Sequence, residues 1–170
     1  MDRRNFLELS SVAALGAMTS GSAAWAQGEP MKAKDLNAYL RSLCEVTEPS
    51  VDRIVIGDPE TVINAIGTAW MPYWKTLRQA VAQGVNVLVV HEPTFYTHWD
   101  LQDGLEGSPQ PGRDSYLRMR EEKAQWIEEQ GLVIIRCHDV LDKVPEFGIP
   151  FAWGQALGFA NREIVRSETY

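Results

Sequence analysis

The sequence predicts an α/β protein whose core is an open, mostly parallel sheet with helices on both faces. Three features of the 170-residue chain support this class. Short apolar runs rich in Val and Ile recur along it, segments with apolar residues at helical spacing alternate with them, and glycines and prolines separate the two kinds. This alternation is typical of parallel sheets, because each helix returns the chain to the start of the next strand.

The first half of the chain contributes two strands and two helices to this prediction. Leucines at helical spacing predict a helix over 34–43, and a short strand follows at 51–57, where Gly-Asp-Pro marks a turn. The apolar run 62–69 predicts a buried strand. A second helix is expected over 71–84, because proline is tolerated in a first helical turn and the apolar stripe stops at Gly84.

The second half repeats the pattern and completes the predicted sheet. Strand 85–90 is apolar and β-branched, and helix 113–130 ends at a glycine before strand 132–136. The strand, helix, strand order makes these strands parallel. A short helix at 150–157 and a last strand at 162–167 end the chain, in which no internal repeat is visible.

The N-terminal segment is expected to be an export signal outside the fold. Arg3 and Arg4 precede a weakly apolar, glycine-containing stretch that ends in Ala24-Trp25-Ala26, a pattern typical of a twin-arginine signal peptide. An ordinary N-terminal helix or a membrane anchor is the alternative. Removal of residues 1–26 leaves a domain of residues 27–170, which we expect to be periplasmic or secreted, with no stable membrane anchor.

Charge and cysteine content exclude some classes of protein. The formal net charge is −7 and no basic cluster is present, which argues against nucleic acid as a partner. Cys44 and Cys137 are too few for a scaffold built on disulfides. We expect two buried free thiols, and a single bridge between them is the alternative.

Metal-capable side chains follow two of the predicted strands. His91 and Glu92 come directly after one strand, and His138, Asp139 and Asp142 come after the next. Because the carboxyl ends of parallel strands line the crevice where ligands bind, the two groups are expected to share a site. If the strands are adjacent, this edge of the sheet is a candidate metal site.

The donor types indicate which metals and which chemistry suit this site. We predict His91, Glu92 and Asp142 as ligands, because imidazole and carboxylate together suit Zn, Fe or Mn, as one or two ions. Such ions activate a water molecule near neutral pH, which favours hydrolysis of a small-molecule substrate. His138 is predicted as the catalytic residue, an outer-shell partner or proton shuttle.

Other residues near these motifs have plainer interpretations. His98 lies in a glycine- and proline-rich loop over 97–114, a lid or a surface insertion; we expect a surface histidine, with a further ligand or substrate contact as the alternative. The tryptophans are expected to lie in the core rather than in a base-stacking pocket. Only Trp99 is expected to lie beside the candidate metal site.

Several of these segments resemble the NIF-three-like proteins, described as dinuclear-metal, hexameric proteins and also as type 2 GTP cyclohydrolase-like. The segments that resemble the family are Lys32–Leu36, Gly57–Pro59, Val62–Ala69, Leu77–Gly84, Leu88–Tyr96 and His138–Asp142. The resemblance implies an α/β fold, a homohexamer, and metal ligation by His91 and Asp142. Glu92 stands where the commonest family pattern has a second histidine.

One family feature has no counterpart in this sequence. The family completes its site with a His-x-x-x-Glu pair near the end of a longer chain, and no histidine follows His138. We therefore expect the N-terminal portion of a longer protein, incomplete at its C-terminus; a short form with a weakened site is the alternative.

Three functions remain open from the sequence. The first is an exported, dinuclear-metal hydrolase-like protein, and the second is a non-catalytic metal-binding or oligomeric assembly module. The third is a truncated chain without activity of its own.

Overall fold

The computed structural model describes residues 29–100, 110–145 and 147–159. The contacts within the chain divide it after Pro30, and every described helix and strand belongs to the second unit, Met31–Tyr170. The predicted signal peptide, the strand expected at 162–167 and most of the loop after Asp100 lie outside the described residues.

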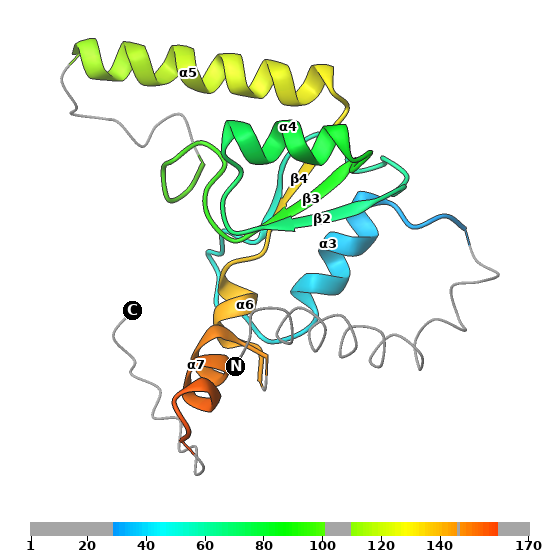
Figure 1. Cartoon of the computed structure of the whole chain (residues 1–170), viewed down its shortest axis with the longest axis vertical. Coiled ribbons are helices and arrows are strands. Elements are labelled where there is room, and N and C mark those ends of the chain that lie inside the picture. The colour runs from blue at the N-terminus through cyan, green and yellow to red at the C-terminus, as the bar shows by residue number, and fades with distance from the viewer. Residues whose placement is uncertain (1–28, 101–109, 146, 160–170) are drawn as a thin grey trace, which may run out of the picture. The chain divides into compact units, whose positions relative to one another are not determined.

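A four-stranded mixed sheet forms the centre of this unit (Figure 1). The strands are β1 (Arg53–Ile56), β2 (Ile66–Ala69), β3 (Val87–Val90) and β4 (Val133–Arg136). Their order is β1-β4-β3-β2, with β2, β3 and β4 parallel and β1 antiparallel to β4 at one edge. The predicted open, mostly parallel sheet is confirmed.

Helices cover both faces of the sheet, as predicted. In chain order they are α3 (Ala33–Arg41), α4 (Trp74–Ala82), α5 (Gln110–Glu129), α6 (Asp139–Lys143) and α7 (Ile149–Ala156). Helices α4 and α5 lie on one side of the sheet and α3 on the other (Figure 1). Within the described residues, no helix is long and apolar enough to cross a membrane.

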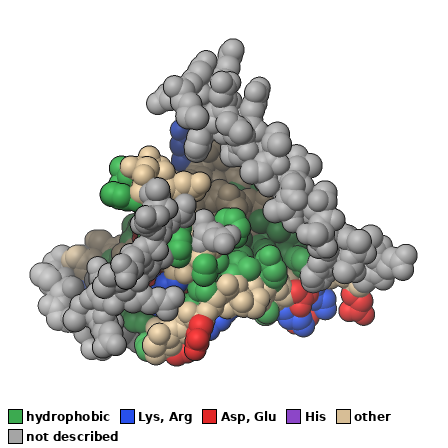
Figure 2. Space-filling model, turned by 90° about the horizontal axis from the view of Figure 1, so that it is seen from below, with side chains coloured by type: hydrophobic (Ala, Val, Ile, Leu, Met, Phe, Trp, Pro, Cys, Tyr) green, Lys and Arg blue, Asp and Glu red, His purple; other side chains and the backbone are tan. Residues whose placement is uncertain are grey.

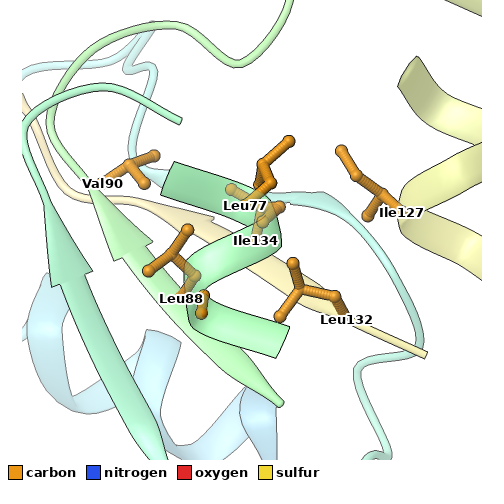
Figure 3. Close-up of a cluster of buried hydrophobic side chains, with 7 residues drawn as sticks. Leu77, Leu88, Val90, Ile127, Leu132 and Ile134 are labelled. Carbon is orange, nitrogen blue, oxygen red and sulfur yellow. The ribbon is translucent and has the colours of Figure 1, made fainter. Parts of the chain in front are cut away.

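The core on the α4 and α5 side consists of aliphatic side chains (Figure 3). Leu77 of α4 and Ile127 of α5 are fully buried, and they pack against Leu88, Val90 and Ile134 of the central strands. Full burial of one such side chain stabilises the fold by roughly 1.5–3 kcal/mol. This cluster therefore attaches both crossover helices to the sheet.

The other face of the same strands packs against α3. Ala33 and Leu36 of this helix contact Val87, Val133 and Ile135. Successive side chains of a strand point to opposite faces, so β3 and β4 supply alternate residues to the two cores. All four residues of β4 are consequently buried, as expected of a strand covered on both faces.

The close approach of β1 to β4 requires a glycine at the end of β1. Gly57 has a φ of +99°, and a Cβ atom there would lie 2.8 Å from the Leu132 carbonyl oxygen and 2.8 Å from Val133 Cα. Only glycine adopts this conformation without strain and leaves the space that Leu132 and Val133 occupy. The turn predicted at this position thus also permits strand packing.

One sequence-based expectation about an element was wrong, and one helix was not predicted. The run 62–69 was expected to be a buried strand, but only Ile66–Ala69 is a strand, and its side chains alternate between exposed and half-buried because β2 is an edge of the sheet. Helix α6 was not predicted, because a five-residue helix contains too little apolar repeat to detect.

Several large apolar side chains remain exposed in the C-terminal part of the described chain. Figure 2 shows hydrophobic side chains on the face seen from below, with charged side chains along its border. Helix α7 buries none of its residues, and Phe147, Trp153, Leu157 and Phe159 are each more than half exposed.

Candidate metal centre

The register of the parallel strands brings the predicted site together. Ala69 pairs with Val90, and Val90 pairs with Arg136, so β2, β3 and β4 end level with one another. Trp70 and His91 directly follow the first two strands, and His138 lies two residues beyond the third. The sequence-based expectation that both motifs lie at one edge of the sheet is confirmed.

Two imidazoles and one carboxylate converge at this edge. The Nε2 atom of His91 lies 3.1 Å from Asp142 Oδ1, and the Nδ1 atom of His138 lies 3.4 Å from Asp142 Oδ2. The two imidazole ring centres are 4.3 Å apart. One potential ligand atom from each of the three residues lies within 4.8 Å of the others, so this group could hold a metal ion.

The Asp52 carboxylate fixes the start of α6, and with it the position of His138. Asp52 is 2% exposed, and it accepts hydrogen bonds from the backbone N–H groups of His138, of Asp139 at 3.1 Å and of Val140 at 2.7 Å. An acidic side chain at a helix N-terminus satisfies N–H groups that have no partner within the helix. One turn later, Asp142 donates its N–H to the His138 carbonyl at 2.9 Å.

Asp139 makes the reciprocal connection from α6 to the segment before β1. Its Oδ2 atom accepts hydrogen bonds from the Ser50 hydroxyl at 2.8 Å and the Val51 N–H at 3.2 Å. Burial raises the pKa of this carboxyl, but the bonds from Ser50 and Val51 and the nearby His138 outweigh burial, so the net pKa lies below its usual value. Asp139 is therefore ionised, and its Oδ1 atom lies 3.4 Å from His138 Nδ1.

Arg136, the last residue of β4, holds the segment that follows β3. Its side chain is 1% exposed; Nε donates to the His91 carbonyl at 3.0 Å and Nη1 donates to the His98 carbonyl. Burial lowers the pKa of the guanidinium, and the carboxylates of Asp100 and Glu92 oppose this shift. Arg136 thus ties β4 to the backbone of His91.

Lys123 of α5 supports the same segment from the helix side. It is fully buried, and its Nζ donates to the Thr94 carbonyl at 2.6 Å and to the Tyr96 hydroxyl at 3.2 Å. Burial lowers its pKa from 10.5 to about 8, and the Asp100 carboxylate opposes this change. Asp100 itself accepts the Phe95 N–H at 2.6 Å, and burial raises its pKa.

Trp70 covers one face of the His91 ring. The two rings stack at 4.2 Å with an interplanar angle of 11°, and the Trp70 carbonyl accepts N–H groups of His91 at 3.1 Å and Glu92 at 2.8 Å. Trp70 is 59% exposed. The expectation that Trp99 alone is beside the site was therefore wrong, because the edge strand β2 places Trp70 against it.

The imidazole nitrogens indicate that the site suits a cation. The Nδ1 atoms of His91 and His138 are buried and have no hydrogen-bond partner among the described residues. Buried polar atoms of this kind are rare and need an explanation such as an ion or water. His91 Nε2 and His138 Nδ1, which lie next to the Asp142 carboxylate, form with it a donor set that fits Zn, Fe or Mn.

Two other residues considered in the sequence lie close by without joining the group. Glu92 is half-buried, and its Oε1 atom lies 3.5 Å from His91 Nδ1, on the ring nitrogen that does not face Asp142. His98 is exposed, as expected, and its ring centre is 6.2 Å from that of His138. Ligation by Glu92 and proton transfer by His138 stay predictions.

The supporting residues Asp52, Arg136 and Lys123 were missed by sequence reasoning. All three are charged and almost completely buried. The only signal was Arg136 at the end of an otherwise apolar run, because charged residues are seldom buried unless they have partners. Asp52 and Lys123 carry no local signal, because their partners lie far away in the sequence.

Sequence comparison finds one informative relative. The chain is 28% identical over 121 residues to a GTP cyclohydrolase 1 type 2 homolog of Chlamydia pneumoniae, a match that covers 69% of this chain and 43% of the relative. No protein-family model matches the chain. The chain thus spans less than half the length of this relative.

Two solved structures share the fold. A Bacillus cereus protein related to NIF3 matches with a TM-score of 0.61 at 14% identity, over 81% of this chain and 35% of the other. A hypothetical protein of Staphylococcus aureus matches with a TM-score of 0.57 at 20% identity, over 77% and 34%. These likenesses establish the fold.

The fold and the site define an α/β protein with a possible His/Asp metal site at the carboxyl edge of a parallel sheet. With the sequence match to the Chlamydia pneumoniae protein, the comparisons confirm the resemblance found in the sequence. The chain is similar in sequence to a GTP cyclohydrolase 1 type 2 homolog and similar in fold to a protein related to NIF3.

We predict that Asp52→Asn destabilises the protein and loosens α6. Asparagine keeps one acceptor oxygen but presents an NH₂ group to backbone N–H donors, so at least one buried donor loses its partner. The free energy of unfolding should fall by about 2 kcal/mol, measured by urea denaturation. Amide hydrogen exchange at His138, Asp139 and Val140 should accelerate.

Asp58→Asn is the matched control for this prediction. Asp58 is exposed and accepts the Glu60 N–H at 2.8 Å, so its change should stay within about 0.5 kcal/mol. Equal losses in the two variants would show that Asp52 is not the specific support of α6.

We predict that Lys123 makes the protein gain stability with rising pH. The folded-state pKa of about 8 lies below the ordinary 10.5, so between these values the unfolded chain binds more protons and folding becomes more favourable as pH rises. The full shift corresponds to about 3 kcal/mol. Lys123→Met should lack this gain.

The test is urea denaturation of wild type and Lys123→Met from pH 7.5 to 10.5, with Lys75→Met as the control at an exposed lysine. As pH rises, the free energy of unfolding of wild type should increase relative to that of Lys123→Met. The free energy of unfolding of Lys75→Met should change with pH as that of wild type does. Parallel curves for all three proteins would contradict the prediction.

Proposed function

We propose that this protein is an exported, divalent-metal-binding, hydrolase-like protein of the NIF3-like family. The observation that carries the proposal is the group of His91, His138 and Asp142, in which two buried imidazole nitrogens lie near carboxylates but make no hydrogen bond with the described residues. These residues would hold the ion. The match to a GTP cyclohydrolase 1 type 2 homolog supports hydrolytic chemistry on a small molecule.

The protein contributes a fixed donor set and a way to move protons. When bound, a divalent transition metal ion would act as a Lewis acid and activate a water molecule. Trp70 stacks on His91 and keeps solvent from one face of that ring. Asp139 and Asp142, each 3.4 Å from His138 Nδ1, would stabilise a proton held on that imidazole.

Glu92 is the proposed ligand of a second ion. Its carboxylate lies near His91 but on the other ring nitrogen, so it could join a neighbouring ion while Asp142 serves the first. Carboxylates commonly bridge or flank pairs of ions. In a dinuclear site Glu92 would add a carboxylate to the His91, His138 and Asp142 group.

The second candidate function is a non-catalytic metal-binding or assembly module. Exposed apolar side chains at α7 favour it, because large exposed apolar surfaces often mark protein contacts. A homo-oligomer, a hexamer by the family resemblance, would be the form in which such a module acts. Metal binding and self-association without turnover would favour this function.

We predict that His91→Ala and Asp142→Asn each weaken metal binding by more than about tenfold, because each removes a donor atom. Isothermal titration with Zn²⁺ and metal analysis of the purified proteins measure the effect. The same preparations are assayed for hydrolysis of model esters, phosphoesters and cyclic amidines, which should decline together with bound metal.

Two further variants sharpen this experiment. His98→Ala is the matched control, since His98 is exposed and outside the group, and it should keep wild-type affinity. His138→Ala separates two roles: loss of metal identifies a ligand, whereas retained metal with lost turnover identifies the proton carrier. Full metal content in both His91→Ala and Asp142→Asn would refute the proposed site.

We also propose that residues 1–26 direct export by the twin-arginine route. When the full chain is produced in a bacterium with that route, the protein recovered from the periplasm should have the mass of residues 27–170. The double variant Arg3→Lys with Arg4→Lys should remain unprocessed in the cytoplasm. The proposal fails if both proteins are unprocessed, or if both are exported equally.

A further inference from the structure

The fold brings the two cysteines of the sequence into one apolar cluster. Cys137 is 7% exposed and packs with Val140 and Val144, and Cys44 packs against the same cluster from the segment after α3. Neither is in a disulfide. Because these are the only two cysteines in the chain, any disulfide chemistry within one molecule must join them.

The contacts of Cys44 place its sulfur beside the turn that follows Cys137. Cys44 Sγ lies 3.7 Å from the carbonyl oxygen of Val140, three residues after Cys137. Cys44 and Val140 are 96 positions apart in the sequence. The approach is therefore a property of the tertiary structure.

Solvent reaches this pair from the side of Cys44. A cavity of about 130 Å³ is lined by Cys44 together with Arg41, Asp52, Val140 and two neighbours of Cys44. Cys44 is half-buried, whereas Cys137 is buried. A small thiol reagent can thus meet Cys44 first, while Cys137 reacts only with a group already held inside the cluster.

We propose that Cys44 and Cys137 are a redox pair that closes to a disulfide through exchange with an oxidised thiol. The Cys44 thiolate attacks one sulfur of the reagent disulfide and releases the first reagent thiol. Cys137 then gives up its proton, attacks Cys44 Sγ and releases the second. Two protein thiols are oxidised, one reagent disulfide is reduced, and the two protons end on the released thiols.

The bond would join two parts of the structure that support the metal centre. It links the segment after α3 to Cys137, whose N–H donates to the Val90 carbonyl at 2.8 Å and which directly precedes His138. A crosslink between residues so distant in sequence restricts the unfolded chain strongly, so it should stabilise the fold. This inference requires neither the proposed metal nor the proposed hydrolysis.

The test uses the full chain, reduced, freed of metal with a chelator and then incubated with oxidised glutathione. Intact-mass analysis should show loss of two hydrogen atoms with no glutathione attached. After denaturation, neither cysteine should react with iodoacetamide. The melting temperature should rise by several degrees over the reduced protein.

Single variants test the order of the two steps. Cys137→Ala should stop with one glutathione bound to Cys44, and Cys44→Ser should take up none. Wild-type protein that stops at one glutathione on Cys44, or that keeps two alkylatable thiols, would overturn the proposal whether or not the variants fold. If Cys44→Ser binds as much glutathione as Cys137→Ala does, Cys44 is not the cysteine that reacts first.

Discussion

The parallel pairing of β3 with β4 is the constraint on which the rest of the site depends. Because Val90 pairs with Arg136, both strands end at the same level, and the polar residues that follow them meet there. A shift of one residue would turn every side chain of a strand to the opposite face and break both cores. The apolar packing that sets this register therefore also sets the distance between His91 and His138.

Buried charged side chains hold the segments that follow the strands in place. Asp52 holds the start of α6, Arg136 holds the backbone of His91, and Lys123 holds Thr94 from the helix side. Each charge is withdrawn from water, which is costly unless hydrogen bonds replace hydration. Here the hydrogen bonds go to backbone groups in irregular segments. These charged side chains therefore hold the segments after β3 and β4 in one conformation.

The described residues contain three potential metal ligands at the edge of the sheet. The His91, His138 and Asp142 group could hold an ion, but three donors leave coordination positions for other ligands. The relatives are more than twice as long as their matched parts.

The sequence by itself determined the fold class, the succession of most helices and strands, and the placement of the His91 and His138–Asp142 motifs after two strands. Each of these follows from the periodicity and order of residues along the chain. It did not reveal that β2 is an edge strand, that α6 exists, or that Trp70 covers His91. The positions of β2 and Trp70 depend on which strands become neighbours, and α6 is too short to leave an apolar repeat in the sequence. Asp52 and Lys123 show the reason most clearly, since their burial is favourable only beside backbone groups that tertiary packing brings to them.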